Sequence, residues 1–223
     1  MERRKNRNVC TVCLEAGVYG IEKNRVKKDR ISLKPFISIW LKPRETIGEI
    51  VQRDSSYMVN FITSALVVLP AIRVSLSDFT SFSGFISSLS LNIVFGAISI
   101  STGLYLWGLL LTFVGQKIDG KGVYRNVIAV IVWSTVPLLC LELFSIMAIT
   151  IIRIFPGVAG KGYIIVYRSI TGLMILWSLF IGTEGLSEVH KIPLGKSFRC
   201  LFISFLIVAA FLFLLGYMLG LIR

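Results

Sequence analysis

The sequence has few of the side chains that most enzymes use for chemistry. It contains one histidine, His190, and only 12 aspartates and glutamates against 24 lysines and arginines. Hydrolysis inside a membrane requires a serine–histidine pair, paired aspartates or a metal-binding motif, and the sequence has none of these. An enzyme is therefore the least favoured class, and we expect no catalytic residues and no cofactor.

Cysteine is also sparse. Of the four cysteines, Cys10 and Cys13 form the only closely spaced pair. Two thiolates at this spacing supply half of a tetrahedral zinc site or a redox couple, whereas a structural zinc site requires four ligands. A second pair is missing, so the sequence predicts no metal site within one chain. Incidental thiols are favoured, and a metal ion shared between two chains is the alternative.

What the sequence has in abundance is apolar residues, which make up 55% of it. Most of them fall in five runs, each close to the roughly 20 residues that a helix needs to cross a bilayer. The runs are Tyr57–Leu76, Asn92–Val114, Val127–Ile152, Tyr163–Thr183 and Leu201–Ile222. A water-soluble core cannot be built from such a sequence. We therefore predict an all-α polytopic membrane protein, a bundle of five transmembrane helices.

The basic residues predict the orientation of this bundle. Thirteen of the 24 precede the first run, and the loops after the second and fourth runs carry three each. Because basic residues remain on the cytoplasmic side of a membrane, the N-terminus is expected inside and the C-terminus outside. The net charge of +12 then places a basic rim beside anionic lipid on the cytoplasmic face, and nucleic acid is not needed to explain it.

The segment before the first run divides in two. Residues 1–34 are polar and basic and are expected to be a mostly disordered cytoplasmic tail, whereas residues 35–55 are expected to form an amphipathic juxtamembrane helix on the cytoplasmic leaflet, ahead of the membrane domain 56–222. An ordinary linker is the alternative for 35–55. Proline suits the first turn of a helix, and an acidic residue there favours the helix dipole. The candidate surface-helix motif consists of Trp40, Pro43, Arg44, Glu45, Thr46 and Ile47.

Two ionisable residues fall inside the predicted spans. Glu142 and Arg168 lie at similar depths in consecutive spans, so we predict that they form an intramembrane ion pair. The pair either only fixes helix register or takes part in proton- or substrate-linked transport. Pro137 is expected to kink the third span. The serine- and phenylalanine-rich segment Phe79–Leu91 is expected to be either interfacial or re-entrant.

Three stretches together resemble a known family. They are Trp40-Leu-Lys-Pro-Arg-Glu-Thr-Ile47; Gly115 to Tyr124 with Trp133-Ser-Thr-Val-Pro137; and Gly182 to His190 with Lys196-Ser-Phe198. In order and spacing they are similar to the Yip family (Ypt/Rab-interacting membrane proteins), specifically its prokaryotic branch. The resemblance covers about residues 36–222.

The resemblance implies a five-span helical fold with a cytoplasmic N-terminus. Eukaryotic members of the family resemble adaptors that bind prenylated Rab-type GTPases and one another, but this tail lacks their aspartate–leucine–tyrosine–glycine–proline element, which argues against GTPase binding. We expect a non-enzymatic scaffold or adaptor in the plasma (inner) membrane of a prokaryote, with anionic lipid, other membrane proteins or further copies of itself as partners. The alternative is a transporter or permease that uses Glu142 and Arg168.

Overall fold

A computed structural model describes residues 34–52, 56–77, 79–154 and 161–219. Within these ranges the chain forms helices and no strand, and five helical segments are long and apolar enough to cross a membrane. They are α4 (Ser56–Ser77), α5 (Phe82–Lys117), α6 with α7 (Tyr124–Ser134 and Val136–Ile154), α8 (Lys161–His190) and α9 (Leu194–Met218). The predicted all-α bundle of five spans is confirmed. The tail with Cys10 and Cys13 lies outside the described residues.

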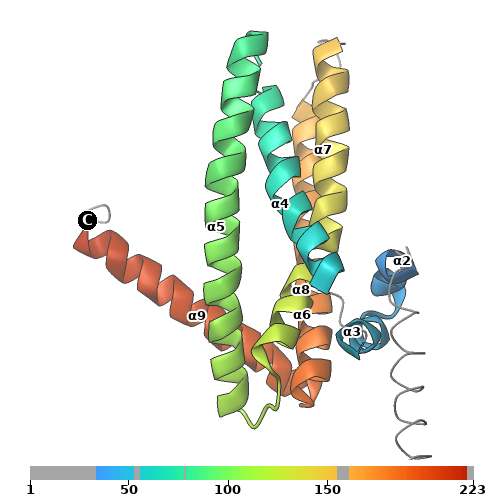
Figure 1. The fold of residues 1–223 in the computed structure, drawn as a ribbon, viewed down its shortest axis with the longest axis vertical. Coiled ribbons are helices and arrows are strands. Elements are labelled where there is room, and N and C mark those ends of the chain that lie inside the picture. Colours follow the sequence, from blue (N-terminus) through green and yellow to red (C-terminus); the bar gives the residue numbers. More distant parts are fainter. Residues whose placement is uncertain (1–33, 53–55, 78, 155–160, 220–223) are drawn as a thin grey trace, which may run out of the picture. The chain divides into compact units, whose positions relative to one another are not determined.

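The helices from Phe36 onward belong to one compact unit (Figure 1). In it, α4 packs against both α5 and α7, and α7 packs against α8. The short helix α6 packs against α5 and α8, and α9 contacts the same two helices. We call the region around α6 the basic end. It comprises α3 (Pro43–Gln52), the α5–α6 loop (118–123), the α8–α9 turn (191–193) and the adjoining helix turns.

The packed core of this unit lies at the basic end. Its fully buried side chains include Ile47, Leu111, Trp133, Ile181 and Leu186. Farther from this end, large apolar side chains are exposed, among them Phe95, Ile98, Phe144 and Leu173. Such exposure suits a surface that contacts lipid. The basic end is therefore stabilised by contacts between helices, and the rest of the unit presents apolar side chains to its surroundings.

The juxtamembrane segment contains two helices where we predicted one. Helix α2 (Lys34–Leu41) ends before Lys42, and α3 begins at Pro43, because the residue before a proline is disfavoured in helical geometry and proline suits a first helical turn. Ile47 and Ile50 are buried, and α3 packs on α8 and α6. The apolar face of α3 thus lies against protein, whereas α2 leaves Ile37 and Leu41 exposed.

The third span is interrupted close to Pro137. Helix α6 ends at Ser134 and α7 begins at Val136. Because proline has no N–H to donate, the helix ladder loses a bond there. The Ser134 hydroxyl donates to the Ile131 carbonyl at 2.7 Å, and the Thr135 hydroxyl donates to the Val132 carbonyl at 2.6 Å. These side chains satisfy backbone oxygens at the junction of α6 and α7.

The segment Phe79–Leu91 is not a re-entrant turn. From Phe82 it forms the first turns of α5, a continuous helix of 36 residues. Ser81 caps this helix by accepting a hydrogen bond from the Gly84 N–H at 3.1 Å. The re-entrant alternative is therefore wrong. Serine hydroxyls in this segment return hydrogen bonds to the carbonyl four residues earlier, as Ser90 does to Ile86. At 1.5 Å per residue, α5 is about 54 Å long.

Candidate functional site

The single histidine lies at the centre of the basic end. His190 is the last residue of α8 and is fully buried. Its Nδ1 accepts a hydrogen bond from the Gly122 N–H at 3.2 Å, so the neutral ring carries its proton on Nε2. The His190 carbonyl accepts a second bond from the Lys121 N–H at 3.0 Å. The end of α8 is thereby joined to the α5–α6 loop.

Three glycines enclose the imidazole ring. A Cβ atom on Gly115 would lie 2.5 Å from Nε2 of His190, one on Gly120 would lie 2.5 Å from Nδ1, and one on Gly122 would lie 2.7 Å from Nδ1. Any of these separations is too short for a carbon atom, so a side chain at these positions would displace the ring. We call His190 with these glycines the glycine cradle.

The loop that forms the cradle is closed by its own backbone. The N–H groups of Ile118 and Gly120 both donate to the Gly115 carbonyl, at 3.1 and 2.9 Å. Asp119 adopts a φ of 70°, a left-handed conformation that aspartate tolerates better than most side chains. The reversal from α5 to α6 is consequently compact and is fixed against His190.

The turn from α8 to α9 is tied to the same region. The Ser187 hydroxyl donates to the Ile192 carbonyl at 2.7 Å, and the Ser197 hydroxyl donates to the Thr183 carbonyl at 2.7 Å. Both serines are fully buried. The first bond joins the end of α8 to the turn, and the second joins the start of α9 to α8. They set the direction in which α9 leaves the basic end.

Helix α3 docks onto this assembly through one small residue of α8. A Cβ atom on Gly185 would lie 2.5 Å from Cδ1 of Ile47 and 2.7 Å from Cγ1 of Val130, so only glycine lets the three helices approach this closely. Arg44 of α3 donates from Nε to Glu188 Oε2 at 3.0 Å. Glu188 also pairs with Lys191. The carboxylate therefore bridges α3 and the α8–α9 turn.

The other residues of the candidate surface-helix motif also make defined contacts. Thr46 is buried and donates to Ser38 Oγ at 2.9 Å, Glu45 pairs with Lys42 at 3.0 Å, and Pro43 is buried. Trp40 is half-buried and packs against the core. Four of the six side chains thus join α2 or α3 to the bundle or to one another, Pro43 starts the second helix, and Glu45 pairs with the residue between the two helices.

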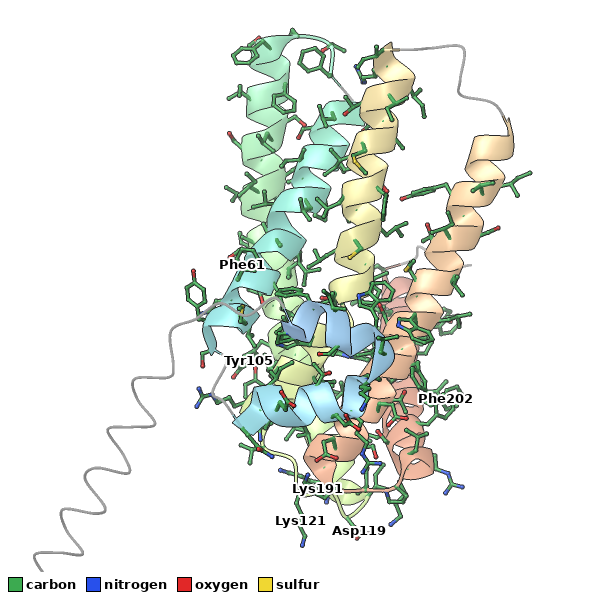
Figure 2. All side chains as sticks on the ribbon, turned by 90° about the vertical axis from the view of Figure 1, so that its right-hand side faces the viewer. Phe61, Tyr105, Asp119, Lys121, Lys191 and Phe202 are labelled. Carbon is green, nitrogen blue, oxygen red and sulfur yellow. The ribbon has the colours of Figure 1, made fainter. Side chains whose placement is uncertain are left out.

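Charge at the basic end is predominantly positive. Lys196 pairs with Asp119 across the loop and the turn at 3.0 Å, whereas Lys121 and Arg199 have no carboxylate partner in the described part of the chain. Figure 2 shows Asp119, Lys121 and Lys191 together at the tip. The basic residues of this end are Lys42, Arg44, Lys117, Lys121, Arg125, Lys191, Lys196 and Arg199, and the acidic ones are Glu45, Glu49, Asp119, Glu184 and Glu188.

The predicted partner of Glu142 is wrong. Glu142 Oε2 accepts from Nε of Arg73 at 2.7 Å, so α7 is paired with α4 rather than with α8. Tyr167 of α8 accepts from the Ser145 hydroxyl at 3.0 Å, and a helix turns by about 100° per residue. Arg168, one position later, is exposed on another face of α8. The charge of Glu142 is thus neutralised by Arg73, which lies near the end of the first predicted span.

No group of three or more histidine, cysteine, aspartate or glutamate side chains in the described ranges is arranged to bind a metal ion. The His190 side chain accepts a bond from a backbone amide, and Cys200 donates to the Leu111 carbonyl at 3.6 Å. The described part of the site is therefore a joint between segments of the chain, with a charged outer surface.

The segments that meet here are the ones that carried the family resemblance. A sequence model described as the Yip1 domain matches residues 37–218. The chain belongs to the Yip1 domain family. It is an integral membrane protein, because the match encloses the five helices that can cross a membrane. Neither a curated protein nor a solved structure matches the sequence.

The Yip1 match gives the glycine cradle its context. The glycines of the cradle belong to the second resembling stretch, and His190 belongs to the last. Ile47, from the first stretch, packs on Gly185 of the last. The sequence alone indicated no role for His190. The available signal was the presence of one histidine and of three glycines at the end of α5 and in the loop that follows, which becomes meaningful only when the two segments are brought together.

Proposed function

We propose that this Yip1-domain protein is a non-enzymatic membrane scaffold or adaptor whose basic end faces the cytoplasm. There it engages anionic lipid and, through the same surface, other membrane proteins or further copies of itself. The observation that carries the proposal is the convergence of α3, the α5–α6 loop and the α8–α9 turn on one rigid, mainly positive end. The resemblance to the prokaryotic branch supports the plasma (inner) membrane of a prokaryote as its location.

Rigidity is what distinguishes this end from an ordinary set of loops. The cradle, the Glu188 bridge and the Lys196–Asp119 pair fix the positions of the surrounding cations relative to one another. A preorganised surface binds with a smaller loss of conformational entropy than flexible loops do. Lys121 and Arg199 are the cations best suited to this role, because no carboxylate of the described residues neutralises them.

A second candidate function, transport, is favoured by one observation, the Arg73–Glu142 ion pair within the spans. Intramembrane charges often mark proton or ion pathways. Against it, the pair is mutually neutralised, and Glu142 is not among the residues that line the cavity at the basic end. A flux in proteoliposomes that requires Glu142 but leaves stability unchanged in Glu142→Gln would establish transport in place of the scaffold.

Topology tests the orientation on which the proposal depends. A reporter that is active only outside the cytoplasm should be active when fused after Arg223 and inactive when inserted at Lys121, because basic loops remain inside. A reporter that is active only in the cytoplasm should give the reverse pattern at the same two positions. An inactive external reporter after Arg223 would contradict the five-span orientation.

Lipid selectivity tests the role of the unpaired cations. Replacing both Lys121 and Arg199 with glutamine should lower the preference of the protein for phosphatidylglycerol over phosphatidylcholine. Each basic residue near an anionic surface contributes about 1 kcal/mol, so the loss is up to roughly fivefold per charge at low salt. Spin-labelled lipids in reconstituted membranes measure this preference.

The matched control removes two cations from the opposite side. Arg168→Gln combined with Arg223→Gln changes the net charge equally, and it should leave the preference for lipid in the cytoplasmic leaflet nearly unchanged because that surface is unaltered. Equal losses in the two double variants would show that net charge alone, and not the basic end, determines lipid selectivity.

A further inference from the structure

The only histidine of the sequence is completely buried in the glycine cradle. Histidine is the side chain that ordinarily changes its charge between pH 5 and 8. In the cradle the ring is bound in its neutral form, since Nδ1 of His190 accepts from the Gly122 N–H at 3.2 Å. A ring nitrogen that accepts a hydrogen bond has no free lone pair for a proton. Protonation of Nδ1 therefore breaks a bond that joins α8 to the α5–α6 loop.

The cradle has no place for a charged ring. A doubly protonated imidazole carries two N–H donors and needs an acceptor for each. The cradle presents an N–H group to Nδ1, and Nε2 has no hydrogen-bond partner in the described part of the chain. Gly115, Gly120 and Gly122 lie so close that none of them could carry a Cβ atom without overlapping the ring. A buried charge without partners is costly, so the charged ring has to leave the cradle.

No neighbouring acid compensates that charge. In the described ranges no carboxylate forms an ion pair with His190. Asp119 pairs with Lys196, and Glu188 pairs with Arg44 and Lys191. Cations outnumber acids among the elements around the ring, which disfavours a further positive charge there. The charged and titratable groups of these elements are Arg44, Glu45 and Glu49 in α3, Lys117 in α5, Asp119 and Lys121 in the loop, Tyr124 and Arg125 in α6, Glu184 and Glu188 in α8, Lys191 in the turn, and Lys196 and Arg199 in α9.

The loop that the ring holds carries part of the basic surface. Two bonds attach this loop to the last residue of α8, one from the Gly122 N–H to Nδ1 of His190 and one from the Lys121 N–H to its carbonyl. Asp119, in the same loop, neutralises Lys196 of α9. Departure of the ring would therefore loosen the segment that positions Lys121 and would weaken the pairing of Lys196.

We propose that His190 is a proton-operated switch for the basic end. Above about pH 6.5, the ordinary pKa of histidine, the neutral ring fills the cradle and the loop is closed. At lower pH the protonated ring leaves the cradle, the loop opens, and the basic end gains a positive charge. The switch rests on the proposed function, in which this end faces anionic lipid. A leaflet at about −30 mV concentrates protons roughly threefold at its surface, so contact with such lipid favours the open form.

Amide hydrogen exchange of the full-length protein in detergent micelles measures the opening. Protection of the loop amides 118–123, corrected for the intrinsic dependence of exchange on pH, should be constant above about pH 6.5. Below that pH it should fall about tenfold per pH unit, because each opening takes up one proton. Amides around Gly103, in the middle of α5, are the internal reference and should keep their protection.

Magnetic resonance of the ring shows whether His190 is the group that titrates. Because the sequence has one histidine, nitrogen-15 labelling of histidine gives one pair of ring signals, provided that the affinity tag contains no histidine. Above about pH 6.5 these signals should be those of the neutral ring with its proton on Nε2. The charged form should appear over the same pH range in which the loop loses protection.

His190→Asn separates the charge of the ring from its hydrogen bond. An asparagine oxygen can still accept from the Gly122 N–H but cannot gain a charge, so this variant should abolish the fall in protection. Asp119→Asn is the matched control, because it removes a titratable carboxylate from the same loop and should retain the tenfold dependence. If His190→Asn does not fold, the coincidence of ring titration with loop opening in the wild-type protein decides the outcome.

Four results would overturn the proposal. They are loop protection that does not change with pH, a ring that becomes charged while the loop keeps its protection, an unchanged pH dependence in His190→Asn, and its loss in Asp119→Asn. Failure of the switch is separable from failure of the proposed function. The lipid preference tested with Lys121→Gln and Arg199→Gln is measured with the loop closed and survives without a switch. A loop that opens with acid in a protein without that preference contradicts the proposed function alone.

Discussion

Gly115→Ala is expected to lower the free energy of unfolding by about 1–3 kcal/mol, the usual cost of inserting a methyl group into a well-packed region. The new Cβ would lie 2.5 Å from Nε2 of His190. The ring cannot move away, because Gly120 and Gly122 bound it on the loop side and it is fully buried. Unfolding titrated with denaturing detergent and followed by tryptophan fluorescence measures the change.

A second glycine of the same helix provides the control. A Cβ atom on Gly103 would meet no other atom within 4 Å. Gly103→Ala should therefore leave stability unchanged or raise it by about 0.5–1 kcal/mol, since alanine favours a helix over glycine. In the background of His190→Ala, Gly115→Ala should become nearly harmless. Equal stabilities for the two single alanine variants would show that the cradle is not tightly packed.

The second large effect concerns the ion pair within the spans. Arg73→Gln and Glu142→Gln should each destabilise the protein, because each leaves its partner charged and unpaired in a low-dielectric setting. The double substitution should recover part of the loss, since both charges then disappear. Polar couplings in membrane proteins average about 0.6 kcal/mol and reach about 1.7, so the coupling energy from a double-mutant cycle should fall in that range.

Arg168→Gln is the matched control for this cycle. Arg168 lies on an exposed face of α8 and has no ion pair in the described ranges. Its replacement should change stability by less than about 0.5 kcal/mol, as substitutions away from buried networks usually do. Additive losses for Arg73→Gln and Glu142→Gln would contradict the pairing of α4 with α7.

Hydropathy predicted the five spans because it detects apolar runs of sufficient length, yet it set several of their ends too early or too late. The second run was expected to begin at Asn92, whereas α5 begins at Phe82. The fourth was expected to end at Thr183, whereas α8 continues to His190. At the end of α8 the helix continues beyond the apolar run where α3 and α6 cover it, and a hydropathy profile contains no information about such neighbours.

The contacts of individual side chains were harder to predict than the helices. Depth arguments placed Glu142 and Arg168 at one level, but pairing also depends on which way each residue faces around its helix. The observed partner, Arg73, belongs to a span that is not consecutive with α7 along the chain. In the same way, His190 and Gly122 are 68 residues apart in sequence, and only the folded chain brings them together.

The glycine cradle also has a consequence for biosynthesis. Ribosomes add roughly 5–20 residues per second, so the 68 residues between Gly122 and His190 separate the two by about 3–14 s. During that interval the α5–α6 loop has been synthesised but the ring that fills it has not, and Arg44 must await Glu188 for still longer, 144 residues. The basic end thus cannot assemble before α8 is complete, and translation must proceed into α9, where Lys196 and Arg199 lie, before its surface exists in final form.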